Sequence, residues 1–240
     1  MSERIAIVVA LEAEVVPLVR RWKRLTWEVG GRAVTVFEHD HAVLLCGGIG
    51  PAAARRAAEA LVERISPAAI LSLGLAGALQ LQGRVGDVIW PAEVVDAASG
   101  TRFRTSGGAG VVVSSPVIAG AGEKESLAQR FPGALAVDME GAAAAEVAQR
   151  HGLPFMAAKA ISDELNFPMP PLGRFVQENG KLDRAGVVGF AALRPWLWPV
   201  LVRLARNSGL AARRLAQSVQ PRLEGNALKN LKLTVASRVY

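Results

Sequence analysis

Short apolar runs alternate with amphipathic segments along most of this 240-residue chain. The run from Arg4 to Leu11, RIAIVVAL, is almost continuously apolar, which is typical of a strand that is buried on both faces. Residues 32–39 instead alternate between apolar and polar, which predicts a strand with one exposed face. From these two patterns we predict strands at 4–11, 32–39, 41–46, 69–73, 86–90, 111–113, 135–138 and 154–161.

Helical patterns occupy the intervals between several of these strands. Pro51 suits the first turn of a helix that we predict over 51–66, and Gly152 suits the end of a helix over 140–151. A third helix is expected at 184–193, whereas FPMPP at 167–171 favours a loop. Strands that alternate with helices predict an α/β fold with a mostly parallel or mixed sheet.

The end of the chain has a different character. Residues 194–220 predict an amphipathic helix with four arginines, 203, 206, 213 and 214, opposite its apolar face. That face comprises Leu197, Val200, Leu201, Leu204, Ala211, Leu215 and Val219. From residue 191 onward there are nine basic residues and one acidic residue, so this segment has a net charge of +8. The net charge of the whole chain is +7, so residues 1–190 together carry about −1. We predict a main domain over 1–193, with 194–240 packed on it or extending from it.

Composition excludes several classes of protein. A single cysteine, Cys46, excludes an intramolecular disulfide framework, and we interpret it as a small buried apolar residue. His39 and His41 have no further ligand at motif spacing, so no metal site is predicted. The first apolar run is interrupted by Glu12 and Glu14 and is not followed by a cleavage site, so a cytoplasmic protein is expected. The basic segment matches no nucleic-acid-binding module, so nucleic acid is not an expected partner.

Glycines or carboxylates follow each buried strand. They are Glu12 and Glu14, GGIG at 47–50, GLAG at 74–77, Asp138-Met139-Glu140 and Ser162-Asp163. Because ligands bind at the carboxyl ends of the strands in α/β sheets, we predict a site there.

Structural roles for the same residues remain open at this point. Glu14 could favour the dipole of a helix that begins near Val15, and Glu140 could sit in the first turn of its helix. Asp163 could cap a short turn, and Met139 could be a core residue.

Six segments resemble, in order, the nucleoside phosphorylase/nucleosidase superfamily, and in particular the methylthioadenosine and adenosylhomocysteine nucleosidases. They are ALEAE (10–14), GGIGPAAA (47–54), LSLGLAGAL (71–79), VGDVI (85–89), AVDMEGAAAAEVA (136–148) and PFMAAKAISD (154–163). The resemblance covers roughly residues 1–165. It implies a mixed, twisted, barrel-like sheet surrounded by helices, a homo-oligomer, and cleavage of the N-glycosidic bond of a purine nucleoside.

The resemblance also implies a role for each residue at the strand ends. Asp163 matches the acid that protonates the leaving purine, so it must hold a proton near neutrality, which burial favours, and Ser162 would orient it. Glu140 matches the carboxylate that binds the ribose hydroxyls, where its charge suits an oxocarbenium-like transition state. Met139 would pack against the sugar, and Glu14 matches the carboxylate that activates water.

Other positions bear on how the ligand is held. Gly48 and Gly77 would let the backbone approach the ligand closely. Val117 and Ile118 stand where the family has a purine-stacking phenylalanine, so base recognition differs here. The phosphate loop of the hexameric purine phosphorylases is missing, which, together with Glu14, favours hydrolysis. Phosphate as a co-substrate bound elsewhere remains open, and no other cofactor is expected.

The insertion before the last helix resembles the hopanoid-associated branch of the superfamily, on ISDELNF (161–167) and ALRPWLWP (192–199). That branch is implied to release adenine from adenosylhopane, a lipid-linked nucleoside. Tryptophans and arginines on 194–220 suit peripheral contact with the inner membrane face, while docking of that helix on the domain is the alternative. A transmembrane span is not predicted, since Arg194, Pro195 and Pro199 interrupt the apolar run. A soluble methylthioadenosine/adenosylhomocysteine nucleosidase, a purine nucleoside phosphorylase and a non-catalytic nucleoside-binding protein are the other hypotheses.

Overall fold

One mixed sheet forms the centre of the protein. A computed structural model describes residues 4–177 and 179–224. Its strands are β1 (Ile5–Val9), β2 (Lys23–Glu28), β3 (Ala33–His39), β4 (Ala42–Cys46), β5 (Ala69–Ala78), β6 (Val88–Ile89), β7 (Glu93–Asp96), β8 (Arg102–Arg104), β9 (Val111–Ser114), β10 (Ala134–Asp138) and β11 (Phe155–Asp163).

Strand β5 is the branch point of this sheet. The main path runs β2-β3-β4-β1-β5-β10-β9-β7-β8, while β11 pairs with β5 and with β6. Residues Ala69–Ser72 of β5 pair in parallel with β1, and Gly77–Ala78 pair antiparallel with β10. Because β11 also lies parallel to β5 along most of its length, the sheet turns back on itself at this strand. The mixed, curved sheet confirms the expected fold class.

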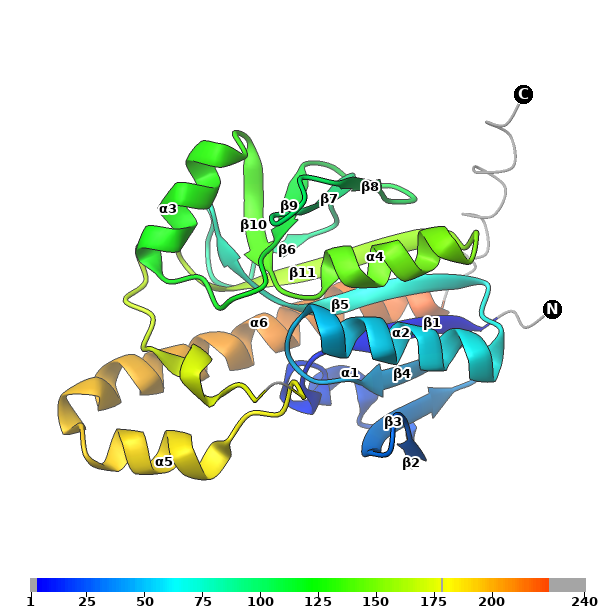
Figure 1. The fold of residues 1–240 in the computed structure, drawn as a ribbon, viewed down its shortest axis with the longest axis horizontal. Coiled ribbons are helices and arrows are strands. Elements are labelled where there is room, and N and C mark those ends of the chain that lie inside the picture. Colours follow the sequence, from blue (N-terminus) through cyan, green and yellow to red (C-terminus); the bar gives the residue numbers. More distant parts are fainter. Residues whose placement is uncertain (1–3, 178, 225–240) are drawn as a thin grey trace.

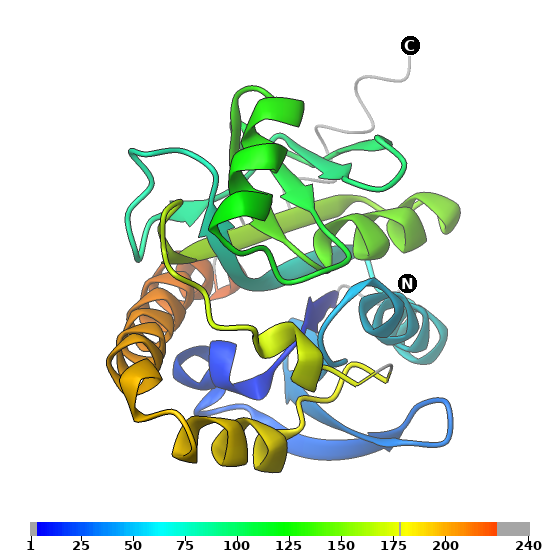
Figure 2. The same ribbon diagram turned by 60° about the vertical axis from the view of Figure 1, so that its left-hand side comes forward.

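Helices cover both sides of the central strands. They are α1 (Val16–Val19), α2 (Pro51–Ile65), α3 (Ala121–Arg130), α4 (Gly141–Arg150), α5 (Arg184–Ala192) and α6 (Trp198–Glu224), with short turns η1 (Glu12–Glu14), η2 (Leu172–Phe175) and η3 (Pro195–Leu197). Helices α2 and α4 lie side by side on one face, and α6 lies on the other (Figures 1 and 2).

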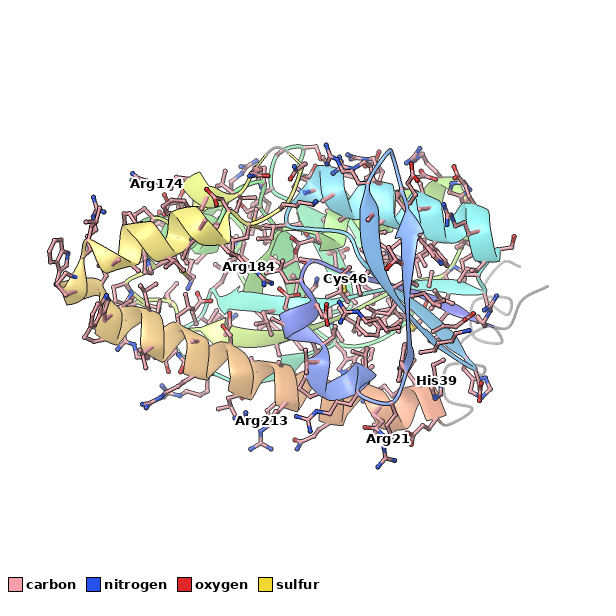
Figure 3. The ribbon with its side chains drawn as sticks, turned by 90° about the horizontal axis from the view of Figure 1, so that it is seen from below. Arg21, His39, Cys46, Arg174, Arg184 and Arg213 are labelled. Atoms are coloured by element: carbon pink, nitrogen blue, oxygen red, sulfur yellow. The ribbon has the colours of Figure 1, made fainter. Side chains whose placement is uncertain are left out.

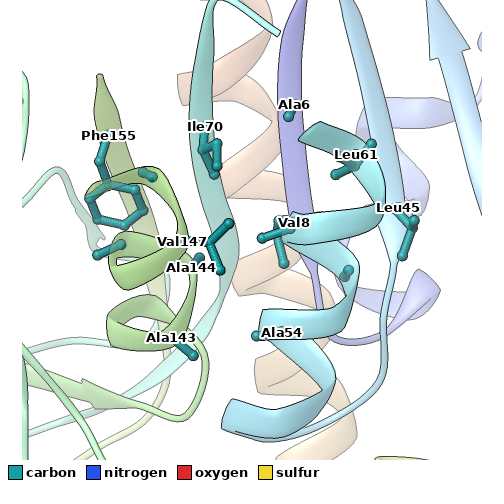
Figure 4. Close-up of a cluster of buried hydrophobic side chains, with 14 of the residues drawn as sticks. Ala6, Val8, Leu45, Ala54, Leu61, Ile70, Ala143, Ala144, Val147 and Phe155 are labelled. Atoms are coloured by element: carbon teal, nitrogen blue, oxygen red, sulfur yellow. The ribbon is translucent and has the colours of Figure 1, made fainter. Parts of the chain in front are cut away.

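The two faces carry separate apolar clusters. Alanines of α2 and α4 dominate the first cluster, where Ala54 and Ala144 are fully buried against Val8 and Ile70 of the sheet (Figure 4). These small side chains let the two helices pack closely on the strands. The second cluster joins α6 to β1, β5 and β11 through Ala211, Ala212, Leu215, Ala216, Val219 and Leu223.

Several boundaries differ from the sequence prediction. Strand β5 continues through GLAG to Ala78, and β11 continues to Asp163, so these glycines and the aspartate lie within strands. Strands β2, β7 and β8 and helix α3 were not predicted. Helix α3 has a polar sequence, AGEKESLAQR, which carries little periodic signal. Cys46 has no disulfide partner, and burial raises the pKa of its thiol to about 12.

Residues 184–210, which we call the elbow, project from one end of the molecule (Figure 3). None of these residues is buried, whereas the second half of α6 packs into the core. Within the described chain, no single helix is long and apolar enough to cross a membrane. One pair of helices has the length and hydropathy of a membrane span when the two are taken together, but the pair is bent by 108°; it comprises Arg184–Ala192 and Pro195–Glu224. The division of domains at residue 193 stays a prediction, and 225–240 lie outside the described residues.

Enlarging a buried alanine at the helix–sheet contact should destabilise the fold. We expect Ala144→Leu to cost about 1–3 kcal/mol of unfolding free energy, because a fully buried site without free space must distort. Ala52→Leu, at an exposed position of α2, is the matched control and should change stability little. Urea unfolding of both variants measures the difference, and equal midpoints would contradict the close packing described here.

Candidate active site

The predicted carboxylates line one cavity of about 220 Å³ at the carboxyl ends of β1, β5, β10 and β11. Helix α3, the segment before η2 and the middle of α6 complete its walls. Its lining residues include Glu14, Ile49, Gly77, Val117, Ile118, Lys124, Asp138, Met139, Glu140, Ser162, Asp163, Met169, Leu172, Leu204 and Ser208.

Glu14 faces the cavity, while its neighbour Glu12 does not. Glu12 pairs with Arg24 at 2.5 Å near the surface. Oxygen Oε2 of Glu14 is buried and has no hydrogen-bond partner among the described residues. A Cβ added to Gly74 would lie 3.1 Å from this oxygen, so a glycine in β5 makes room for the carboxyl group. Burial and the charge of Glu140 raise the pKa of Glu14 to about 8.

Glu140 lies where β10 gives way to α4. Its Oε1 accepts a hydrogen bond from the backbone N–H of Gly50 at 2.8 Å, so the GGIG loop holds this carboxylate. Burial and the charge of Asp138 raise the pKa of Glu140 to about 7. It makes no capping hydrogen bond to α4, and Glu14 makes none to α1. Neither side chain is therefore a hydrogen-bonding cap, although Glu140 occupies the N-cap position of α4.

A buried ion pair lies beneath these two glutamates. Lys159 Nζ contacts Asp138 Oδ2 at 2.6 Å and donates to Ser72 Oγ at 3.0 Å, and both charged side chains are fully buried. Burial alone would lower the pKa of Lys159, but Asp138 and Glu140 outweigh it and raise the pKa. Asp138 also accepts from Ser114 Oγ and from the N–H of Gly141, which joins β9, β10, β11 and α4.

Asp163 also lines the cavity, and it lies in β11 rather than at a turn. Its Oδ1 accepts from Ser162 Oγ at 2.7 Å, as the orienting role of Ser162 requires. Its Oδ2 forms a buried ion pair with Lys124 of α3. The sequence led us to expect an isolated buried acid, and the structure instead gives Asp163 a cationic partner.

The remaining predicted residues divide between two hollows. Met139, Val117, Ile118 and Gly77 line the cavity, and no aromatic residue within the described chain joins them. Gly48 does not: it lies in a neighbouring hollow, with φ of 103°, where an added Cβ would be 2.8 Å from the carbonyl oxygen of Gly180. No group of three or more metal-ligating side chains occurs within the residues that the structure describes.

Comparison with known proteins places this geometry in a family. The profile of the phosphorylase superfamily matches residues 4–119 and 108–184. This chain belongs to the phosphorylase superfamily. A 5′-methylthioadenosine/S-adenosylhomocysteine nucleosidase of Staphylococcus epidermidis is 27% identical over 199 residues, 68% of this chain and 87% of that protein. The corresponding nucleosidase of Oceanobacillus iheyensis is 30% identical over 195 residues, 66% of this chain and 85% of that one.

Solved structures agree on the fold of this superfamily member. The methylthioadenosine/adenosylhomocysteine nucleosidase of Helicobacter pylori aligns with a TM-score of 0.68 at 18% identity, over 93% of this chain and 98% of that one. Futalosine hydrolase of Helicobacter pylori aligns with a TM-score of 0.64 at 19% identity, over 92% and 99%. The expected superfamily and enzyme class are thereby confirmed.

Sequence reasoning missed both buried lysines of this superfamily member. The burial of Lys159 could have been predicted, since this lysine is the one charged residue in the apolar run FMAAKAI of β11. The burial of Lys124 could not have been predicted, because charged residues are common on a helix as polar as α3.

The raised pKa of Glu14 predicts a pH-dependent stability. Because the folded pKa of about 8 exceeds the ordinary 4.5, the contribution of Glu14 is fully present below pH 4.5 and is lost as pH rises through 8. We expect Glu14→Gln to raise Tm at pH 8.5 by about 4 °C or more and to change it little at pH 5. Thermal scans at both pH values measure this, with Glu125→Gln, at an exposed position, as control. A Tm difference that is the same at both pH values would contradict the buried carboxyl group.

Proposed function

We propose that this protein hydrolyses the N-glycosidic bond of an adenine nucleoside that carries an apolar group at its 5′ position, and so releases adenine. The observation that carries the proposal is the placing of Glu14, Glu140 and Asp163 around one cavity. Each has a hydrogen-bonding state that suits a different part of the reaction.

Different residues of the cavity wall suit the purine base and the ribose of the nucleoside. Asp163, oriented by Ser162, would receive the purine ring and deliver its proton, with Val117 and Ile118 against the base. Glu140, held by the N–H of Gly50, would bind the ribose hydroxyls and stabilise the positive charge that develops on the sugar. Met139 would pack against the sugar.

Glu14 suits the activation of water. Its buried Oε2 lacks a partner among the described residues, so it is free to accept a hydrogen bond from a ligand. With the pKa of Glu14 raised to about 8, its ionised form, which becomes more populated as pH rises toward 8, is a stronger base toward water than an ordinary glutamate.

Hydrolysis is favoured over phosphorolysis by the charge of the cavity wall. Burial, with the charges of Glu140 and Asp138, raises the pKa of Glu14, and burial, with the charge of Asp138, raises the pKa of Glu140, while the charge of Lys159 lowers both. Beside Glu14 a phosphate dianion would meet carboxyl groups and a lysine that is already paired with Asp138, whereas a neutral water molecule needs no cation there.

The apolar 5′ group is supported by apolar side chains of the cavity wall, namely Met169, Leu172 and Leu204. Leu204 and Ser208 belong to the elbow, which thus forms part of this wall. A long apolar substituent leaving the cavity along α6 would therefore meet the elbow. This arrangement suits an adenosylhopane-like substrate better than methylthioadenosine, the substrate of the runner-up hypothesis.

The elbow itself has the composition of a peripheral membrane contact. Five large apolar side chains on it are at least half exposed, namely Val188, Leu193, Trp196, Trp198 and Val202. From 184 to 223 there are seven arginines and no acidic residue. Tryptophan and arginine beside apolar residues are typical of segments that lie at an anionic lipid surface.

The shape of the elbow is fixed by internal contacts. Trp198 Nε1 donates to the carbonyl oxygen of Ala191 at 2.8 Å across the bend, and the Arg194 guanidinium lies 4.2 Å from the centre of the Phe190 ring. The exposed apolar surface is thus presented by an ordered segment. A symmetric contact between two elbows would oppose their arginines, so we favour anionic lipid over a second copy, while a homo-oligomer formed elsewhere remains part of the proposal.

Base release from defined substrates tests the reaction. We expect chromatography to detect adenine from detergent-dispersed adenosylhopane, without a need for phosphate and at a higher rate than from methylthioadenosine. Asp163→Asn should lower the rate by about a hundredfold or more, since a general acid contributes that much. Efficient release from methylthioadenosine alone would support the runner-up, and dependence on phosphate would indicate a phosphorylase. Release that is unchanged in the Asn variant would exclude the role of Asp163.

Liposome sedimentation tests the elbow separately. The double variant Leu193→Ser, Trp196→Ser should bind vesicles that contain anionic phosphatidylglycerol several-fold more weakly than the wild type, because both side chains are mostly exposed. Leu81→Ser, at an equally exposed site on the body, is the matched control. Equal binding by all three proteins would exclude the elbow as the contact, and binding that is indifferent to lipid charge would exclude the role of its arginines.

A further inference from the structure

Helix α3 buries one side chain fully, and that side chain is a lysine. Lys124 has no exposed surface, while the apolar residues of the same helix are only partly buried. A lysine is rarely buried unless its charge is paired. The groups that contact its ammonium nitrogen should therefore explain why this lysine is buried.

The ammonium group of Lys124 is held against the proposed general acid. Its Nζ donates to Oδ2 of Asp163, to the carbonyl oxygen of Glu164 at 2.8 Å and to the carbonyl oxygen of Asp163 at 3.5 Å. A Cβ added to Gly77 would lie 2.6 Å from Lys124 Cε and 2.9 Å from Asp163 Oδ2. Only glycine at this position of β5 leaves room for the pair.

Both oxygens of Asp163 therefore accept hydrogen bonds, one from Ser162 and one from a cation. Such donors stabilise the charged form of a carboxylate. The other charged groups nearby do not change this, since Glu164 points toward Arg84 at 4.0 Å and Glu14 and Glu140 lie elsewhere on the cavity wall. The ion pair places the amino group of Lys124 directly against Oδ2 of Asp163.

We propose that Lys124 supplies the proton that Asp163 passes to the departing base. This inference rests on the proposed function. When the N-glycosidic bond breaks, its electron pair goes to the base, and a ring nitrogen takes a proton from Asp163 Oδ2. Asp163 takes a proton from Lys124, which becomes a neutral amine, and the water that attacks the sugar loses its proton to Glu14. Exchange with solvent then returns a proton to Lys124 and removes one from Glu14. Lys124 acts through Asp163 and is a positioning residue.

Two variants separate proton supply from simple charge pairing. Arginine can keep the ion pair but does not give up a proton, so Lys124→Arg should lower kcat by about a hundredfold while KM changes little. Lys124→Met removes both functions, so Asp163 must carry its own proton and kcat should begin to fall at a lower pH than in the wild type. Lys23→Met, at an exposed position, is the control. Wild-type kcat in the Arg variant, or a wild-type pH profile in the Met variant, would overturn the proposal.

A second readout does not depend on turnover. Carboxyl ¹³C NMR of aspartate-labelled protein should show different titration curves for Asp163 in the wild type and in Lys124→Met, with Asp163→Asn identifying the signal. The same titration in both proteins would exclude an effect of Lys124 on the proton of Asp163. If the wild type releases no adenine although the titrations differ, the proposed function fails and the ion pair stands. Loss of activity in Lys124→Met with unchanged titration would instead mean that the lysine is only a packing residue.

Discussion

Two buried lysine–aspartate pairs determine how the carboxylates of this site are arranged. Lys159 and Asp138 join β11 to β10 beneath the cavity, and Lys124 and Asp163 join α3 to β11 at its wall. Taking charges out of water is unfavourable, and removing one partner of a buried pair typically costs about 3–5 kcal/mol. The strand ends and α3 must therefore keep their relative positions for these charges to remain compensated. Small residues allow this: Gly74 and Gly77 in β5 and Gly141 at the start of α4 leave space that a Cβ would occupy.

The two pairs give the site two electrostatic regions. Around Lys159 there are three carboxyl groups, Asp138, Glu140 and Glu14, and the cation compensates only part of their charge. Burial first, and then this uncompensated charge, raise the pKa values of both glutamates. At Asp163 one carboxylate meets one lysine and one serine hydroxyl. A protonatable base and a proton-bearing pair thus share one cavity, which is the division that acid–base cleavage of a glycosidic bond requires.

Much of this could be predicted from the sequence, because strand ends gather at one edge of an α/β sheet. Glu14, Glu140 and Asp163 follow or end apolar runs, and all three line the cavity. The extension of β5 through its glycines could not be predicted, since glycine disfavours strands unless a neighbour needs the space, and those neighbours are Glu14 and Lys124. Lys124 was also hidden: burial of a charge on a polar helix depends on a partner that is 39 residues away in the sequence. Gly48 was singled out as a ligand contact, but its positive φ serves an approach to Gly180.

Helix α6 connects the elbow to the chemistry. Its last three turns are anchored in the core by Leu215, Val219 and Leu223. Leu204 and Ser208, in the middle, form part of the cavity wall, and Trp198 begins the helix at the exposed bend. A helix is stiff over this length, so any contact that orients the start of α6 also orients this part of the cavity wall. Under the proposed function, the arginines and the tryptophans of the elbow would set the direction from which an apolar substituent reaches Glu140 and Asp163.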